Sequence, residues 1–198
     1  LGHMFAASHT FNNNAAGSCA SFNGANQREA ATAFEPGSGS TLMSYGGTCA
    51  PADLQLSRDL YFHGQSLDQM VLYISSGDGA GCAAISNTGN GGITITDWTP
   101  TVTVPDRTPF RLSLRATDAD FDPVTVAWEE VDAGAASPPE LDNGDRALFR
   151  SYLPSQVQWR SFPRLDYVLN NASVPPDTYT CAAGPPAVNC LTGETLTT

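Results

Sequence analysis

Two histidines lie close together near the start of the chain, in an otherwise apolar run. His3 and His9 are six positions apart in the stretch L-G-H-M-F-A-A-S-H-T-F. Imidazole nitrogen is a common ligand of zinc, and a catalytic zinc site keeps one coordination position open for water. The pair is therefore a candidate for two ligands of one zinc ion. The alternative is that both are ordinary core or surface residues.

The spacing of the two histidines sets a condition on the backbone. On a continuous α-helix, six residues correspond to a rotation of roughly 600°, so the His9 side chain would face away from that of His3. Both rings reach one metal only if the helix ends between them and the chain turns back. We therefore expect a helix end within residues 1–11.

A methionine and a tyrosine in a later apolar stretch extend the pattern. Met43 and Tyr45 lie in E-P-G-S-G-S-T-L-M-S-Y-G-G-T-C, which contains turn residues on both sides of the methionine. Together with G-H-M-F-A-A-S-H-T-F-N and Y-F-H-G-Q-S-L-D-Q-M, this stretch resembles bacterial reprolysin-like (adamalysin-type) metallopeptidases of the metzincin class. The resemblance covers residues 1 to about 76. Its first part resembles the second half of the zinc motif H-E-x-x-H-x-x-G-x-x-H.

The resemblance implies a role for each matching residue. It makes His3 and His9 two of three zinc ligands, and Met43 the methionine of the turn that underlies the zinc site. Tyr45 has the spacing at which astacin- and serralysin-type relatives place a tyrosine that approaches zinc or a reacting oxyanion. The alternatives are that Met43 is plain core packing and that Tyr45 is a buried tyrosine with a satisfied hydroxyl.

The chain departs from the motif in two places. The first histidine and the general-base glutamate would lie immediately before Leu1, so we expect an N-terminally truncated fragment. Ala6 stands where the motif has the glycine at which the helix turns back. A residue other than glycine in the left-handed conformation costs about 1–2 kcal/mol.

The function implied by the resemblance is peptide-bond hydrolysis by a secreted zinc endopeptidase. A zinc-activated water would attack the scissile carbonyl with help from the glutamate. The expected cofactor is Zn²⁺ and the expected partner is a protein or peptide substrate. The chain as given lacks one ligand and the base and is expected to be inactive. The alternative function is a non-catalytic secreted binding or adhesion module that carries a β-sandwich domain.

Composition narrows the choice of partners. The chain has 198 residues, with nine Lys and Arg against 20 Asp and Glu, for a net charge of -11. This balance argues against nucleic acid and against an anionic membrane surface as partners. No apolar run reaches the roughly 18 residues that indicate a membrane span.

The cysteines indicate an exported protein with disulfides. Five are present, at positions 19, 49, 82, 181 and 190, and none has C-x-x-C spacing. Our pairing hypothesis joins Cys19 to Cys49 and Cys181 to Cys190, which leaves Cys82 over. The sequence does not fix this connectivity.

One helix is predicted by its apolar period. Leu67, Met70, Val71 and Ile74 recur at i, i+3, i+4 and i+7, which makes one apolar stripe. Ser66 is the expected N-cap. Residues 77–100 are rich in glycine and serine, and we interpret them as a linker.

From about residue 101 the apolar period changes to two. The alternating segments are 101–104, 110–116 and 124–128. They indicate an immunoglobulin-like β-sandwich over residues 101–198, and an incomplete one. The stretches D-R-T-P-F-R-L-S-L-R-A-T-D-A-D and L-F-R-S-Y-L-P resemble the β-domain that often follows the catalytic domain. The expected fold class is α+β, with the C-terminal part of a metzincin domain at residues 1–76.

Two further sets of residues have metal-binding chemistry. His63 opens the predicted helix, where we expect a packing or capping role. Asp118, Asp120 and Asp122 alternate, so their carboxylates are candidate ligands for a hard cation such as Ca²⁺. No EF-hand pattern completes them, and the alternative is a solvated turn.

Overall fold

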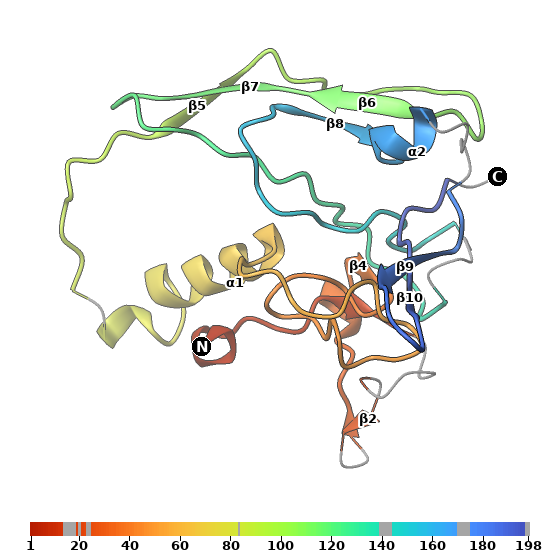
Figure 1. Ribbon diagram of the computed structural model, residues 1–198. Helices are drawn as coiled ribbons and strands as arrows, with labels where there is room; N and C mark the ends of the chain where they lie inside the picture. The colour runs from red at the N-terminus through yellow and green to blue at the C-terminus, as the bar shows by residue number, and fades with distance from the viewer. Residues whose placement is uncertain are drawn as a thin grey trace.

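The chain forms a mixed α+β structure with few helices and small sheets. This agrees with the expected α+β class. The computed structural model describes residues 1–13, 19, 21–22, 25–82, 84–138, 144–169 and 175–196. Figure 1 shows the N-terminal elements and α1 on one side and the strands β5 to β8 on the other. No helix within these ranges is long and apolar enough to cross a membrane.

The helical elements are the 3₁₀ helices η1 (Gly2–Phe5), η2 (Ala30–Thr32) and η3 (Ala80–Cys82) and the α-helices α1 (Gly64–Ser75) and α2 (Leu165–Leu169). The strands are β1 (Phe11–Asn12), β2 (Ser21–Phe22), β3 (Ala25–Asn26), β4 (Glu35–Pro36), β5 (Ile93–Thr96), β6 (Phe110–Ser113), β7 (Arg115–Asp118), β8 (Trp159–Phe162), β9 (Thr178–Ala182) and β10 (Val188–Leu191). All sheets among the described residues are two-stranded, in the pairs β1–β4, β2–β3, β5–β7, β6–β8 and β9–β10.

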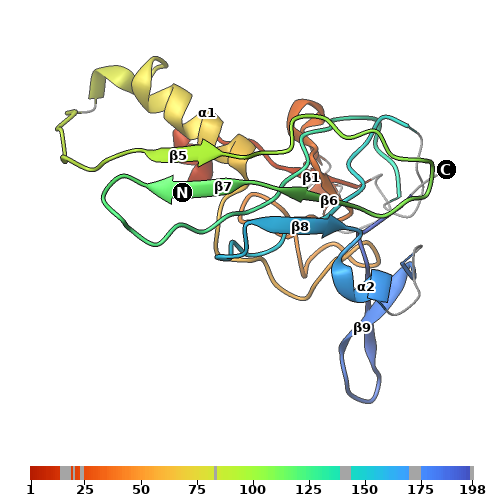
Figure 2. The same ribbon diagram turned by 90° about the horizontal axis from the view of Figure 1, so that it is seen from above.

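The strands of the second half differ in part from the predicted ones. The segment predicted over 110–116 forms two strands, β6 and β7, which pair with β8 and β5 respectively (Figure 2). Residues 101–104 form no strand, and 124–128 contribute only an isolated bridge between Val126 and Ser155. Strand β5 lies inside the segment interpreted as a linker. Alternation marks residues that suit a strand, but a strand also needs a partner with free backbone groups.

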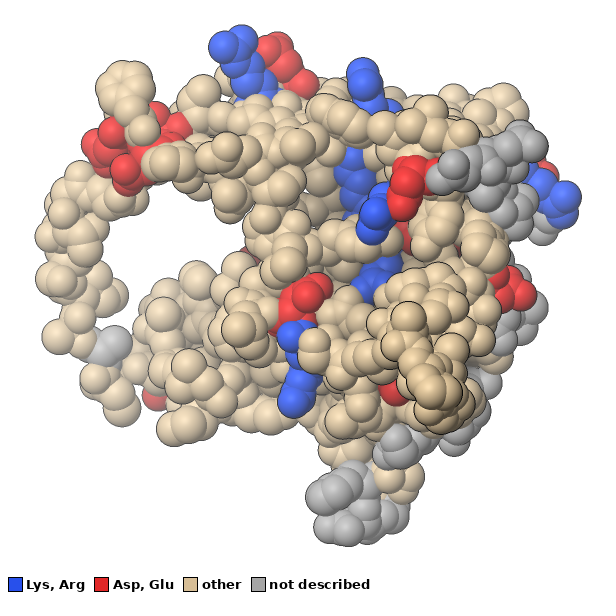
Figure 3. Space-filling view, in the orientation of Figure 1, with Lys and Arg blue, Asp and Glu red and all other residues tan. Residues whose placement is uncertain are grey.

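Helix α1 begins earlier than the sequence indicates. Its N-cap is His63, whose Nδ1 accepts a hydrogen bond from the Gln65 N–H at 3.2 Å, so the capping role expected for His63 is present. Ser66, the predicted N-cap, is buried inside the first turn instead. The predicted apolar stripe lies largely open, with Val71 57% and Ile74 40% exposed. In Figure 3 an open gap separates α1 from the β5–β7 side of the molecule.

Two disulfides join the predicted pairs. Cys19 is bonded to Cys49, and Cys181 to Cys190, while Cys82 is an exposed free thiol. The first disulfide lies in a buried apolar cluster with Phe11 and Ala52. The strand that follows His9 therefore packs directly on a covalent bridge.

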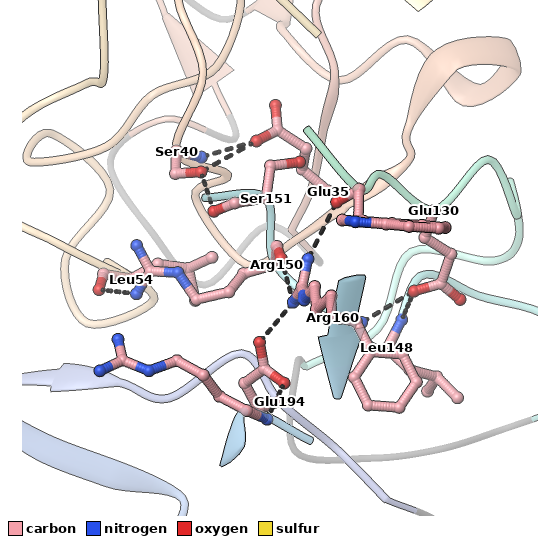
Figure 4. Close-up of polar contacts among 12 residues, drawn as sticks. Glu35, Ser40, Leu54, Glu130, Leu148, Arg150, Ser151, Arg160 and Glu194 are labelled. Carbon is pink, nitrogen blue, oxygen red and sulfur yellow. Dashed lines mark hydrogen bonds and ion pairs between the residues drawn. The ribbon is translucent and has the colours of Figure 1, made fainter. Parts of the chain in front are cut away.

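A buried polar seam connects the two halves of the sequence (Figure 4). The Arg150 guanidinium donates to the Leu54 carbonyl at 2.9 Å, and the Ser40 hydroxyl donates to the Ser151 carbonyl at 3.0 Å. Arg160 forms an ion pair with Glu194 at 2.6 Å. Arg150 and Ser151 thus join the later part of the chain to the segment that contains Ser40 and Leu54.

A partly buried carboxyl in this region, that of Glu130, has a shifted pKa. Both the Leu148 and the Phe149 N–H donate to one oxygen of Glu130 at 2.8 Å. Burial raises the pKa of Glu130 to about 7, against the lowering effect of these two hydrogen bonds. The neutral acid is therefore favoured in the folded chain over a wide range of pH.

Opening the Cys19–Cys49 bridge should cost more stability than opening Cys181–Cys190. The first closes a separation of 30 residues and the second one of 9. In the chain-entropy model these correspond to about 3–4 and about 2–3 kcal/mol. Urea unfolding of the two double Cys→Ser variants measures the difference. An equal loss in both, or none, would contradict the assignment.

Glu130 should make the chain less stable as pH rises from 5 to 8. The folded pKa of about 7 lies above the reference value of 4.5, so the folded state keeps a proton that the unfolded state releases. The contribution is complete below about pH 4.5 and is lost as pH rises through 7.

The variant Glu130→Gln keeps an oxygen acceptor for both N–H groups but does not titrate. Urea unfolding across this range should show a decline that is smaller by about 2–3 kcal/mol than in the wild type. Asp106→Asn, at an exposed carboxyl, is the control and should leave the decline intact. A wild-type decline in Glu130→Gln would show that Glu130 does not titrate in this range.

Candidate metal centre

The first helix ends between the two histidines, as their spacing requires. Helix η1 ends at Phe5, and Ala6 follows with φ 63° and ψ 13°, in the left-handed region. The Ala7 N–H then donates back to the Gly2 carbonyl at 3.1 Å, which closes the turn. Ala6 takes the conformation that the motif assigns to glycine, at a cost of about 1–2 kcal/mol.

The two imidazoles converge on each other. His3 Nε2 and His9 Nε2 are 3.0 Å apart, and the ring centroids are 4.7 Å apart with the planes at 76°. His3 Nδ1 lies 2.8 Å from the Ala7 carbonyl, and His9 Nδ1 lies 2.6 Å from the Gln27 carbonyl. A carbonyl oxygen only accepts, so each Nδ1 carries the proton.

This tautomer leaves a lone pair on each Nε2. In the neutral rings the two lone pairs point into one small volume, where they repel unless a proton or a metal cation lies between them. Burial lowers the pKa of His9, although its hydrogen bond to Gln27 raises it; the nearby His3 lowers it further. The neutral ring, which is the form that binds metals, is therefore favoured at His9.

The separation of the two nitrogens fits a zinc ion. With Zn–N bonds of about 2.0–2.1 Å, nitrogens 3.0 Å apart subtend about 95° at the metal, and an ideal tetrahedral angle needs only a few tenths of an ångström more. Within the described ranges no third His, Cys, Asp or Glu completes a group of three metal ligands. Two imidazole nitrogens are therefore the donors that converge here among the described residues.

Met43 is buried next to the segments that carry the two histidines. It is 6% exposed, and its Sδ occupies the space that a Cβ on Gly2 would fill. The Thr10 N–H donates to the Met43 carbonyl at 3.2 Å. Met43 thus contacts Gly2 and Thr10, the residues next to His3 and His9, although it is 34 residues after His9 in the sequence.

Tyr45 stands at the edge of the histidine pair. Its hydroxyl donates to Gln27 Oε1 at 3.2 Å and lies 3.5 Å from His9 Nε2. The ring is half-buried against Phe11, with centroids 4.9 Å apart. Burial raises the pKa of Tyr45, so the hydroxyl keeps its proton and is available as a donor.

An open cleft of about 390 Å³ leads to the two rings. Besides the histidines it is lined by Ala6, Ala7, Ser8, Asn26, Gln27, Arg28 and Glu29. Arg28 is held in place, since its Nε donates to Asn12 Oδ1 at 2.8 Å. The sequence analysis missed Gln27, whose main contact to His9 is through a backbone carbonyl that any residue could supply.

The sequence also missed Glu35. It lies in a stretch that we interpreted as a turn, yet its side chain is fully buried. Its carboxylate lies between the strand after His9 and the segment that contains Met43. A charged residue next to P-G-S-G carries no sequence signal for such a position.

The aspartates at 118–122 contact backbone N–H groups. Asp118 Oδ1 accepts from the Asp120 N–H at 2.8 Å within a turn, and Asp120 accepts from the Gly91 N–H, 29 residues away in sequence. No group of three metal-binding side chains forms here within the described part of the chain. The Ca²⁺ site stays a prediction.

Comparison with known proteins finds no relative. No family model, no curated protein and no solved structure matches the chain. The argument for function therefore depends on the site itself.

Replacing Met43 should destabilise the chain as a core truncation. Met43→Ala removes a buried side chain next to the segments that carry the two histidines, and we expect the free energy of unfolding to fall by about 2–5 kcal/mol in urea. The matched control is Met4→Ala, because Met4 is 74% exposed; it should change stability by less than about 0.5 kcal/mol. Equal effects of the two variants would contradict the placement of Met43.

Proposed function

We propose that His3 and His9 are two of the three protein ligands of a catalytic zinc ion, in a secreted endopeptidase of the metzincin type. The observation that carries the proposal is the pair of Nε2 atoms 3.0 Å apart, each ring having its Nδ1–H on a backbone carbonyl. Metal-binding histidines characteristically donate their other ring nitrogen in this way, which fixes the tautomer and the ring orientation.

The side chains of this chain have distinct tasks in the proposed reaction. Zinc, when bound, activates a water and polarises the scissile carbonyl. The Ala7 and Gln27 carbonyls hold the two imidazoles in the metal-binding tautomer. The Tyr45 hydroxyl, 3.5 Å from His9 Nε2, is within reach to donate a hydrogen bond to an oxyanion that develops beside the metal.

The two disulfides support secretion. Disulfides persist in oxidising compartments and are rare where glutathione keeps thiols reduced. We further infer that the strands from β5 onward belong to an immunoglobulin-like β-domain that follows the catalytic part, since β5 pairs with β7.

A specific observation favours the alternative of a binding module. A mainly apolar cavity of about 370 Å³ lies beside the β5 and β6 strands, lined by Ile95, Trp98, Thr99, Ser113, Leu114 and Trp128. Exposed tryptophans are common at binding surfaces. Zinc binding at the histidines separates the two functions, since the binding module does not require it.

Zinc titration by calorimetry tests the proposal. We expect one zinc per chain, with affinity lowered at least tenfold in His3→Ala and in His9→Ala, because each removes a ligand. Ser8→Ala, which alters the cleft wall without removing a ligand, is the matched control and should bind as the wild type does. Wild-type affinity in the double variant His3→Ala/His9→Ala would refute the proposal.

The activity assay uses two forms of the chain. The 198-residue chain should not hydrolyse casein, because it has no glutamate at the base position of the motif. The same chain with His-Glu placed directly before Leu1 should bind zinc at least tenfold more tightly. Chelator-sensitive turnover at enzyme-like rates by the unextended chain would contradict the proposed division of roles.

A further inference from the structure

We propose that Glu35 is a positioning residue: its buried carboxylate fixes the segment that carries His9 to the segment that carries Met43. The inference rests on the proposed function in treating His9 as a metal ligand. No motif of the zinc site includes this residue, and the hydrogen bonds around it carry the argument.

The carboxylate connects two segments that are far apart in sequence. Its Oε2 accepts hydrogen bonds from the hydroxyls of Thr10 at 2.5 Å and Thr41 at 2.6 Å. Its Oε1 accepts from the N–H groups of Ser40 at 2.8 Å and Thr41 at 3.1 Å. Thr10 directly follows His9, and Thr41 is two residues before Met43.

Burial makes these contacts obligatory. Glu35 is 0% exposed, and among the residues that the structure describes no arginine or histidine forms an ion pair with it. A buried carboxylate that lost its hydrogen bonds would leave a costly unsatisfied group. The neutral donors must therefore converge on it, which constrains the position of Thr10.

The backbone of the segment that follows His9 is also held by Glu35 and its strand. Strand β1 pairs in parallel with β4, and the Glu35 N–H donates to the Thr10 carbonyl at 2.9 Å. Gly39, at φ +64°, brings Ser40 back to the carboxylate, and a Cβ there would lie 3.1 Å from Glu35 Cβ. Glu35 thus contacts Thr10 through both its backbone and its side chain.

Isosteric variants separate positioning from general stability. Thr10→Val removes only the hydroxyl that joins the residue after His9 to the Glu35 carboxylate. Glu35→Ala removes the whole network, whereas Glu35→Gln conserves it: the amide oxygen accepts from the two N–H groups and the amide nitrogen donates to the two hydroxyls. Thr192→Val is the matched control, because the hydroxyl of this buried threonine donates to the Pro176 carbonyl.

Two readouts are taken on folded protein. The first needs no metal: NMR measures the nuclear Overhauser effect between the His3 and His9 rings. The same spectra identify the tautomer of His9. The second is zinc affinity by calorimetry. Thr10→Val and Glu35→Ala should weaken the inter-ring effect and lower zinc affinity about 10–100-fold, while Glu35→Gln and Thr192→Val should keep both within about threefold of the wild type.

Each outcome decides between the two proposals. If Glu35→Ala does not fold, Thr10→Val alone decides. Wild-type rings and zinc affinity in folded Thr10→Val would overturn the role of Glu35, as would equal losses in Thr192→Val. If the wild type shows the ring contact but binds no zinc, the proposed function fails, and the role of Glu35 is then decided by the metal-free readout.

Discussion

The burial of the Glu35 carboxylate is the constraint on which the candidate site depends. A buried charged group without a cationic partner in the described structure is tolerated only with its acceptor sites filled. Thr10, Ser40 and Thr41 fill them. Because these donors come from two separate segments, satisfying one side chain brings together the strand after His9 and the segment before Met43.

The positions of the two histidine rings depend on further backbone contacts. The left-handed turn at Ala6 reverses the chain, so that His3 and His9 approach from opposite sides. Two carbonyls then take the Nδ1 protons, and both Nε2 lone pairs are directed at one point. Tyr45 lies beside the His9 ring, and an open cleft leads to both histidines.

The sequence predicted some of these features and not others, for physical reasons. Two histidines six apart required a helix end, and the turn at Ala6 provides it. The apolar stripe of α1 predicted the helix, but it did not predict that this stripe would be exposed. Periodicity shows which face of a helix is apolar and not which residues pack on that face. The I-T-I-T of β5 was concealed by the glycine-rich residues around it, and a strand depends on a partner distant in sequence. Glu35 gave no signal, because its role comes from contacts that only folding creates.

The central claim is that His3 and His9 bind one zinc ion together through their Nε2 atoms. X-ray absorption spectroscopy of the zinc-loaded chain tests this most directly, because imidazole ligands give a characteristic multiple-scattering pattern. The account predicts two imidazole nitrogens at about 2.0–2.1 Å from zinc, with water-type oxygen in the remaining positions. A spectrum with oxygen ligands alone, unchanged when both histidines are replaced by alanine, would contradict it.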